Sequence, residues 1–232
     1  MSRVFRFAFV GLAVAGLGSV ANAQVCAGTP SFSVGSARLG ASMLIGDNAK
    51  AYGVQGALGA HKGWFLSGDY SHAKDDNSDG SSNAGGATIG YEWSVNTTKS
   101  VEFCPMVGVQ AQNGSLIGLH PTAPNDPQNT LDWHFGGALG WVATQSGDMM
   151  VIPSIGAAIV ARSYKSTIVM QGQPNPNTTE TFGQVTGAIG FVLKTQWTIS
   201  PMVQVPLSET NGKTAYGVAV SYNFNLPKHG HI

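Results

Sequence analysis

The stretch YGVAVSYNF, residues 216–224, decides the fold expected of this chain. Its bulky side chains fall on the even positions, which are Tyr216, Val218, Val220, Tyr222 and Phe224. Its odd positions carry small or mildly polar residues, which are Gly217, Ala219, Ser221 and Asn223. A period of two indicates a β-strand with one bulky apolar face. In a water-soluble protein that face would point into a core, and in a membrane barrel it would point outward.

The same alternation recurs along the chain in nine further segments, at residues 37–45, 51–60, 63–72, 86–95, 101–111, 131–142, 150–163, 182–193 and 197–207. No window has a convincing helical period. Short links at 60–63, 96–99, 145–148 and 194–196 alternate with longer polar links. This alternation is typical of an up-and-down barrel with tight turns at one end and larger loops at the other. We therefore predict an all-β, closed antiparallel barrel of about ten strands, with eight as the alternative if weak segments merge.

The composition indicates which face is outside. Charged residues make up 10% of the chain, against about 25% in typical soluble domains. The small faces carry Gly, Ala and Ser where a soluble sandwich would carry Lys and Glu. The bulky faces carry Val, Ile and Leu, with aromatic residues near the strand ends, as lipid-facing strands do. We therefore expect the bulky faces to contact lipid, and a soluble barrel or sandwich is the alternative. The net charge of zero gives no indication of a nucleic-acid partner.

The N-terminus has the pattern of an export signal. Arg3 and Arg6 precede the uncharged apolar run 7–20, and Ala21-Asn22-Ala23 is a small-x-small cleavage site. A retained anchor helix would need about 20 apolar residues, more than this run supplies. A lipoprotein signal is also disfavoured, because the residues before Cys26 are not those of a lipobox. We predict a signal peptide at 1–23 and one domain at 24–232, with the barrel at about 31–225 and a periplasmic tail at 226–232.

Three prolines recur at equal spacing, Pro105, Pro153 and Pro201, each between apolar residues near the start of a strand. Proline cannot donate to a strand ladder, so we expect a bulge or loosened pairing beside each one, near the short-turn end.

Outward bulky faces leave the polar residues of the small faces inside the barrel. The charged or ionisable ones are Arg38, Asp69, Glu92, Glu102, Asp132, His134 and Arg162, and neutral ones include Gln55, Gln110, Gln184 and Asn223. Unpaired charges in a narrow interior are costly, so we expect ion pairs that bridge the lumen and brace it. A narrow channel for small solutes is the main alternative. A hydrolase that uses Asp69 with His72, or Asp132 with His134, is the second alternative, although no nucleophile motif accompanies them.

The chain has two cysteines, Cys26 and Cys104. In an exported chain a disulfide is the simple expectation. The strand count places both residues at the short-turn, periplasmic end, where a bond would attach the N-terminal segment to the barrel base. Two free thiols or a metal pair are the alternatives. No other spacing supports a metal site, and we expect no cofactor.

The aromatic residues expected to form girdles at the two membrane interfaces are Trp64, Tyr91, Trp93, Trp133, Trp141, Trp197, Tyr216, Tyr222 and Phe224. With the export signal, the alternating hairpins and the final Ser221-Tyr-Asn-Phe224, residues 31–225 resemble the small OmpA/OmpX-like outer-membrane β-barrel proteins. That resemblance implies outer-membrane localisation, lipid as the surrounding partner, a monomer and no enzymatic activity. It also implies that the barrel-assembly machinery reads Phe224, although eight residues follow it here and family members commonly end at this aromatic.

Overall fold

A computed structural model describes residues 36–46, 49–60, 63–76, 80–96, 100–115, 127–166, 177–207 and 214–225. The predicted signal peptide, Cys26, the predicted barrel start near residue 31 and the tail at 226–232 lie outside these ranges. Among the described residues, no helix is long and apolar enough to cross a membrane.

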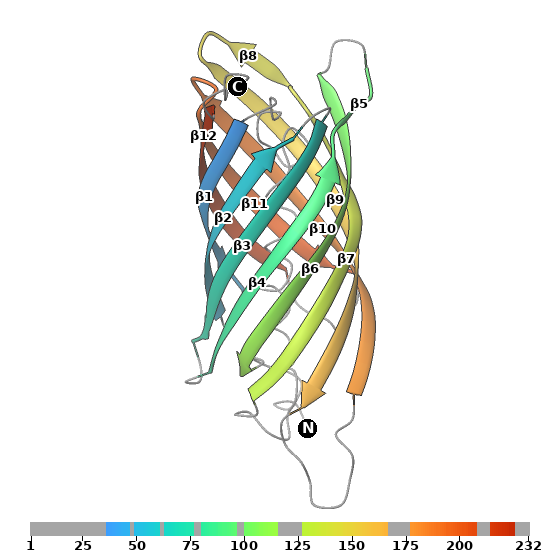
Figure 1. The fold of residues 1–232 in the computed structure, drawn as a ribbon. Helices are drawn as coiled ribbons and strands as arrows, with labels where there is room; N and C mark the ends of the chain where they lie inside the picture. The colour runs from blue at the N-terminus through green and yellow to red at the C-terminus, as the bar shows by residue number, and fades with distance from the viewer. Residues whose placement is uncertain are drawn as a thin grey trace, which may run out of the picture.

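Twelve strands form one antiparallel sheet that closes on itself (Figure 1). They are β1 (Ser36–Ile45), β2 (Ala49–Gly59), β3 (Trp64–Asp75), β4 (Ser81–Tyr91), β5 (Trp93–Ser94), β6 (Val101–Ser115), β7 (Pro127–Trp141), β8 (Thr144–Ser146), β9 (Met149–Ser166), β10 (Asn177–Leu193), β11 (Trp197–Pro206) and β12 (Ala215–Asn225). The short β5 and β8 continue β4 and β7 beyond an interruption, so the barrel wall has ten strands. Ten strands, and not eight, are confirmed, and all ten predicted segments fall on them.

Each wall strand pairs with its neighbours in sequence, and β1 pairs with β12 to close the ring. The closing register sets Leu39 opposite Tyr222 on the outer surface and Arg38 opposite Asn223 on the inner surface. Closure leaves no unpaired strand edge along the wall, which a hydrocarbon environment requires of any sheet. The strands are tilted, with β5 and β8 at the short-turn end of the barrel at the top of Figure 1.

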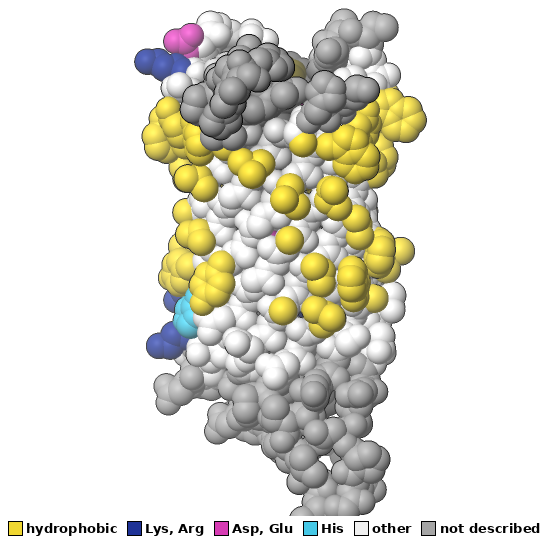
Figure 2. All heavy atoms as spheres, in the orientation of Figure 1, with side chains coloured by type: hydrophobic (Ala, Val, Ile, Leu, Met, Phe, Trp, Pro, Cys, Tyr) yellow, Lys and Arg dark blue, Asp and Glu magenta, His cyan; other side chains and the backbone are white. Residues whose placement is uncertain are grey.

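Alternation along each strand separates two chemically different surfaces. Large apolar side chains such as Leu39, Val54 and Ile159 are more than half exposed on the outside, at 60%, 58% and 57%. In Figure 2 hydrophobic side chains form a broad band across the visible face of the barrel, and protruding charged side chains lie above and below it. We call this band the apolar belt. The prediction that the bulky faces point outward is confirmed, and the belt has the arrangement of a lipid-facing barrel surface.

Pairing is interrupted beside two of the three repeated prolines. On the β6 side of β4, pairing stops at Gly90–Met106 and resumes in unchanged register at Trp93–Phe103, so Pro105 lies in the gap. On the β10 side of β11, pairing likewise stops at one side of Pro201 and resumes at the other. Proline has no N–H to donate at these points, so the predicted loosening is confirmed.

A bulge accompanies the third proline. The β7–β9 register ends at Gly140–Ser154, and the β8–β9 register begins at Thr144–Val151, one residue out of step. The extra residue lies between β7 and β8, opposite Ile152 and Pro153, which is the arrangement of a β-bulge. All three prolines therefore mark the short-turn end of the wall, as predicted.

The β10–β11 link is a tight turn of three residues, 194–196. Lys194 and Thr195 both have positive φ, 51° and 59°, and the Gln196 amide donates to the Leu193 carbonyl over 3.1 Å. Two successive residues in the left-handed region match the right-handed twist of the flanking strands. The turn therefore fixes the register of this hairpin without glycine or asparagine.

Apolar side chains also line the inside, near both ends. At the long-loop end, Leu44 packs with four alanines of β2, β3 and β12. At the short-turn end, Phe65 packs with Cys104 and Ala138, and Ile152 packs with Val192. Phe65, which interrupts the alternation of its predicted strand, is an inward core residue with 1% of its surface exposed. A Cβ on Gly90 would overlap the Phe65 ring, so the missing side chain at Gly90 makes room for it.

Candidate functional site: the polar lumen wall

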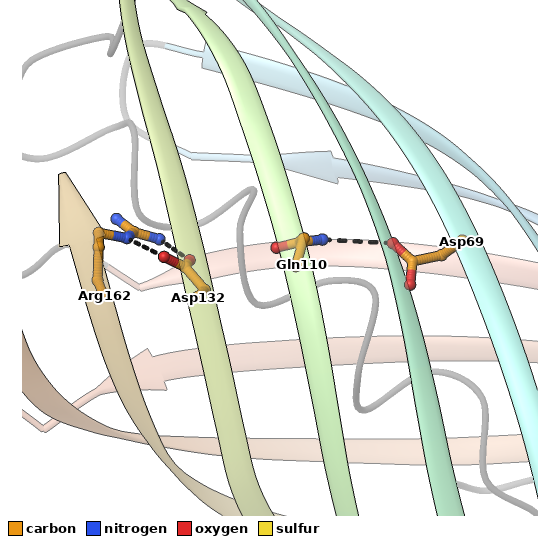
Figure 3. Close-up of polar contacts among 4 residues, drawn as sticks. All are labelled: Asp69, Gln110, Asp132 and Arg162. Atoms are coloured by element: carbon orange, nitrogen blue, oxygen red, sulfur yellow. Dashed lines mark hydrogen bonds and ion pairs between the residues drawn. The ribbon is translucent and has the colours of Figure 1, made fainter. Parts of the chain in front are cut away.

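One row of the inner wall carries three of the seven predicted charged or ionisable residues, Asp69, Asp132 and Arg162. Cross-strand register places Asp69, Gly86, Gln110, Asp132 and Arg162 in successive positions on β3, β4, β6, β7 and β9. We call these five residues the polar row. Figure 3 shows the side chains of Asp69, Gln110, Asp132 and Arg162 at a similar level, with dashed contacts from Arg162 to Asp132 and from Gln110 to Asp69. The row forms because inward positions at the same register of neighbouring strands lie about 5 Å apart.

The strongest contact of the polar row is an ion pair between Arg162 and Asp132. Arg162 Nε donates to Asp132 Oδ1 over 2.8 Å, and Nη2 donates to Oδ2 over 2.5 Å. The two side chains are 0% and 1% exposed. The guanidinium carbon also lies 5.4 Å from the centre of the Phe182 ring. A bidentate pair fixes both geometry and charge balance.

This ion pair joins adjacent strands, so it runs along the wall. The expectation that opposite charges bridge the lumen is wrong for Asp132 and Arg162. The physical reason is the register, which places the two residues directly opposite each other on β7 and β9, within reach without crossing the interior.

The second contact of the polar row links Asp69 to Gln110. Gln110 Nε2 donates to Asp69 Oδ2 over 3.3 Å, across the intervening strand β4. This reach is allowed because Gly86 lies between them: a Cβ there would come within 3.2 Å of Gln110 Cβ and 3.3 Å of Asp69 Oδ1. A glycine on the middle strand thus permits a hydrogen bond between side chains two strands apart.

The remaining predicted charges lie nearer the short-turn end. Arg38 is buried and its Nε donates to Asn223 Oδ1 over 2.5 Å. Glu92, at the β4–β5 junction, is close enough for its charge to act on Arg38, although three strand positions separate them. Here a charge interaction does extend beyond neighbouring strands. Glu102 is also inward and 4% exposed.

Neither candidate Asp–His pair is in contact in the structure. Asp69 faces inward, whereas His72 is exposed on the outer surface and contacts Asn83 Oδ1 at 3.0 Å through Nδ1. The predicted Asp69–His72 pair is wrong, because residues three positions apart on a β-strand point to opposite faces. Asp132 and His134 do share the inner face, but both Asp132 oxygens bind Arg162, and the two ring nitrogens of His134 have no hydrogen-bond partner. No Asp–His contact that could act as a base is formed.

Beside His134 lies a small cavity of about 10 Å³, lined by residues of β4, β6, β7 and β9. That volume has room for about one water molecule. Among the described residues, no three His, Cys, Asp or Glu side chains are grouped so that they could hold a metal ion.

The predicted girdle aromatics lie on the outer surface. Trp64, Trp93, Trp133, Trp141, Trp197 and Tyr216 are exposed, and Tyr91, Tyr222 and Phe224 are half-buried. The half-buried rings pack on neighbours: Trp64 lies 5.3 Å from Tyr91, Trp197 lies 4.9 Å from Tyr222, and Tyr222 stacks on Phe224 at 6.4 Å. The contacts form two aromatic groups at the short-turn end, one on β3 and β4 and the other on β11 and β12.

The spacing of Trp133 and Trp141 fits two girdles. They lie on one face of β7, eight residues apart. At about 3.4 Å per residue and a tilt of about 45°, they are separated by roughly 19 Å along the membrane normal. An outward apolar band is about 25 Å tall, so the two indoles fit near its opposite borders.

Cys104 points into the barrel and is fully buried against Phe65 and Ala138. Its thiol is not free. Cys26 lies outside the described residues, so the Cys26–Cys104 bond stays a prediction. Because Cys104 faces the lumen, a bond to it must form inside the wall, which refines the expected attachment at the barrel base.

Several inner residues were absent from the predicted charged set. Phe182 packs against Val160 and Arg162, and its place on the inner face follows from the period of β10. Gln112 and Thr130 extend the inner surface toward the long-loop end, at 3% and 4% exposure. Gln112 and Thr130 lie just beyond the predicted segments 101–111 and 131–142, since the observed β6 and β7 continue further toward the long loops. Phe182 is the first residue of the predicted segment 182–193, on the same face as Gln184.

No family model matches the sequence, and no curated protein sequence is similar to it. Solved structures are similar in fold. The β domain of the Bordetella autotransporter BrkA is 8% identical, with a TM-score of 0.51, 81% of this chain covered and 97% of that chain. The N-terminal β-barrel domain of Pseudomonas aeruginosa OprF (11% identity, TM-score 0.33, coverage 82% and 98%) and Yersinia pestis Ail (8%, 0.29, 83% and 100%) also match. Identities this low show the fold alone.

Proposed function

We propose that this protein is an integral outer-membrane β-barrel with a structural or surface-exposed role, non-enzymatic and monomeric, whose lumen is braced by side chains. The observation that carries the proposal is the division of every wall strand into an outer apolar face and an inner face. Large apolar side chains surrounding a closed wall need a hydrocarbon environment, because a monomeric soluble protein rarely exposes such an area.

The arrangement of the lumen supports a closed barrel over a channel. The polar row lies between inward apolar clusters near each end, formed around Leu44 at the long-loop end and around Phe65 and Ile152 at the short-turn end. Apolar constrictions oppose ion passage, because an ion entering one loses hydration without gaining ligands. The Asp132–Arg162 pair neutralises the most deeply buried charges of the row.

A narrow channel for small solutes is the second candidate. It is favoured by the many small residues of the inner wall, such as Gly40, Gly108, Gly136 and Ala158, which leave interior space. The hydrolase alternative has no support from geometry, because His134 and Asp132 make no mutual contact and His72 faces away from Asp69.

Two measurements test the proposal in sequence. The mature chain, residues 24–232, should refold in detergent and migrate faster on gels when unheated than when boiled. A chain that stays soluble without detergent would contradict a membrane barrel. The refolded barrel should then produce no reproducible conductance steps in planar bilayers. Regular steps would contradict the closed barrel and support the channel alternative.

A further inference from the structure

A cationic cluster lies on the outer surface of β2 and β3, at the long-loop border of the apolar belt. Strand alternation turns Lys50 and Tyr52 outward on β2, and Tyr70, His72 and Lys74 outward on β3. We call these five residues the cationic border. In Figure 2 dark-blue Lys or Arg side chains and a cyan histidine lie together at the lower left edge of the belt.

The register brings like charges face to face. Lys50 lies directly opposite Lys74, and Tyr52 lies directly opposite His72. Like charges in directly opposed positions of an antiparallel pair are destabilising. Asp76 offsets part of this repulsion, because its carboxylate lies 3.1 Å from Lys50 Nζ. Among the described side chains, the ion pair of this cluster is the one between Asp76 and Lys50, and no acidic group pairs with Lys74.

The chemistry of this surface changes in steps along the strands. Val54 and Leu66 are exposed aliphatic residues within the belt, at 58% and 53%. Next come Tyr70, whose hydroxyl donates to Asn83 Oδ1 over 2.8 Å, and His72, which contacts the same oxygen. The two lysines follow. Aliphatic, then aromatic and polar, then cationic side chains are the order in which a membrane presents chains, interface and charged headgroups.

We propose that the cationic border binds the phosphate of a lipid headgroup in the leaflet at the long-loop end. This inference rests on the proposed membrane function. Directly opposed residues have Cβ atoms about 5 Å apart, so both ammonium groups can reach one phosphate. A phosphate supplies negative charge beyond that of Asp76, which pairs with Lys50, and lysine binds phosphate as a point charge.

The opposite end of the barrel offers a contrast. Lys194 is the other outward-facing lysine or arginine whose side chain the structure describes, and it lies alone in the β10–β11 turn. Its amide donates to the Asp148 carbonyl over 2.7 Å, which places an acidic residue beside it. Two opposed lysines above an aromatic layer therefore distinguish the long-loop border, and Lys194 provides a matched control.

The test measures lipid binding to the detergent-refolded barrel by native mass spectrometry. The probes are a diphosphorylated lipid A and the same glycolipid without phosphates. Lysine near an anionic surface contributes about fivefold in affinity, so Lys50→Gln and Lys74→Gln should each weaken diphosphorylated lipid binding about fivefold, and the double variant about thirtyfold. Lys194→Gln should bind as the wild type does, and Lys50→Arg with Lys74→Arg should retain binding.

Four outcomes overturn the inference. The first is equal binding of the two glycolipids, and the second is wild-type binding by a double Gln variant whose heat-modifiable band shows it is folded. The third is displacement of the diphosphorylated lipid A by inorganic phosphate that binds equally tightly, which would mean that the cluster binds a soluble anion. The fourth is an equal loss in Lys194→Gln, which would indicate a nonspecific charge effect. Failure of the proposed function is distinguishable, because the wild type would then lack the heat-modifiable band altogether.

Discussion

The two faces of β7 show how differently the outside and inside of this wall are specified. Outward, the strand presents Leu131, Trp133, Phe135, Leu139 and Trp141; inward, it presents Thr130, Asp132, His134, Gly136 and Ala138. Any large apolar side chain is suited to the outer face, because lipid chains contact it without directional bonds. The inner face depends on particular partners, since Asp132 is balanced only because Arg162 lies directly opposite on β9. At inner positions, the stability of the barrel should therefore depend on whether a substituted residue keeps its specific partner. At outer positions, it should depend on whether the new side chain is apolar or polar.

Removing one member of the inner ion pair should have the largest effect. Arg162→Leu leaves the Asp132 carboxylate buried without its cation, and breaking a buried pair in this way costs about 3–5 kcal/mol. Urea unfolding of the refolded barrel in lipid vesicles, followed by gel mobility, measures the loss. The double variant Asp132→Asn with Arg162→Gln should recover at least half of it. Equal loss in the single and double variants would mean that charge balance is not what stabilises this row.

A charge on the outer face should come second. Val220 is near the middle of β12 and 40% exposed on the belt. Val220→Arg should lower the unfolding free energy in vesicles by about 2–4 kcal/mol, the cost of a cation near the bilayer midplane. Its inward neighbour provides the control, and Ala219→Ser should change stability by less than about 1 kcal/mol. If Val220→Arg were harmless and the protein stayed soluble, the outer face would be in water.

Filling the space beside Phe65 should have the smallest of the three effects. Gly90→Ala places a methyl group where the ring lies, and overpacking of this kind costs about 1–3 kcal/mol. Gly85, on the same strand, meets only ordinary contacts at 3.6 Å and beyond, so Gly85→Ala should leave the urea midpoint nearly unchanged. Adding Phe65→Leu to Gly90→Ala should restore part of the loss. No recovery would indicate that the strain at Gly90 has another source.

Much of the architecture was predictable because successive side chains of a β-strand alternate between its two faces, so the sequence shows a period of two. The ten segments, the outward direction of residues such as Trp133 and Val218, and the weakened pairing at Pro105 and Pro201 follow from local chemistry. Strand ends on the long-loop side were less predictable, because β9 and β10 continue into polar residues where the apolar alternation fades.

The contacts inside the lumen were less predictable than the faces. That Asp69 and Arg162 point inward follows from the alternation, but their partners depend on register between strands. Sequence reasoning expected charges to bridge the interior, whereas register sets Asp132 beside Arg162. It also grouped Asp69 with His72, whose side chains lie on opposite faces of the wall.

By itself, the sequence determined the class of fold and the side of each strand that faces outward, because both depend on the period of two and on the low content of charged residues. It predicted about ten wall strands with eight as the alternative, and the structure decided for ten. Only the tertiary structure decided which inward residues meet, that Phe65 belongs to the inner core, that Cys104 faces the lumen and that Lys50 opposes Lys74. Those facts depend on how neighbouring strands are aligned, and that alignment is set by turns, bulges and ring closure acting together. The residue pattern of a single strand does not specify it.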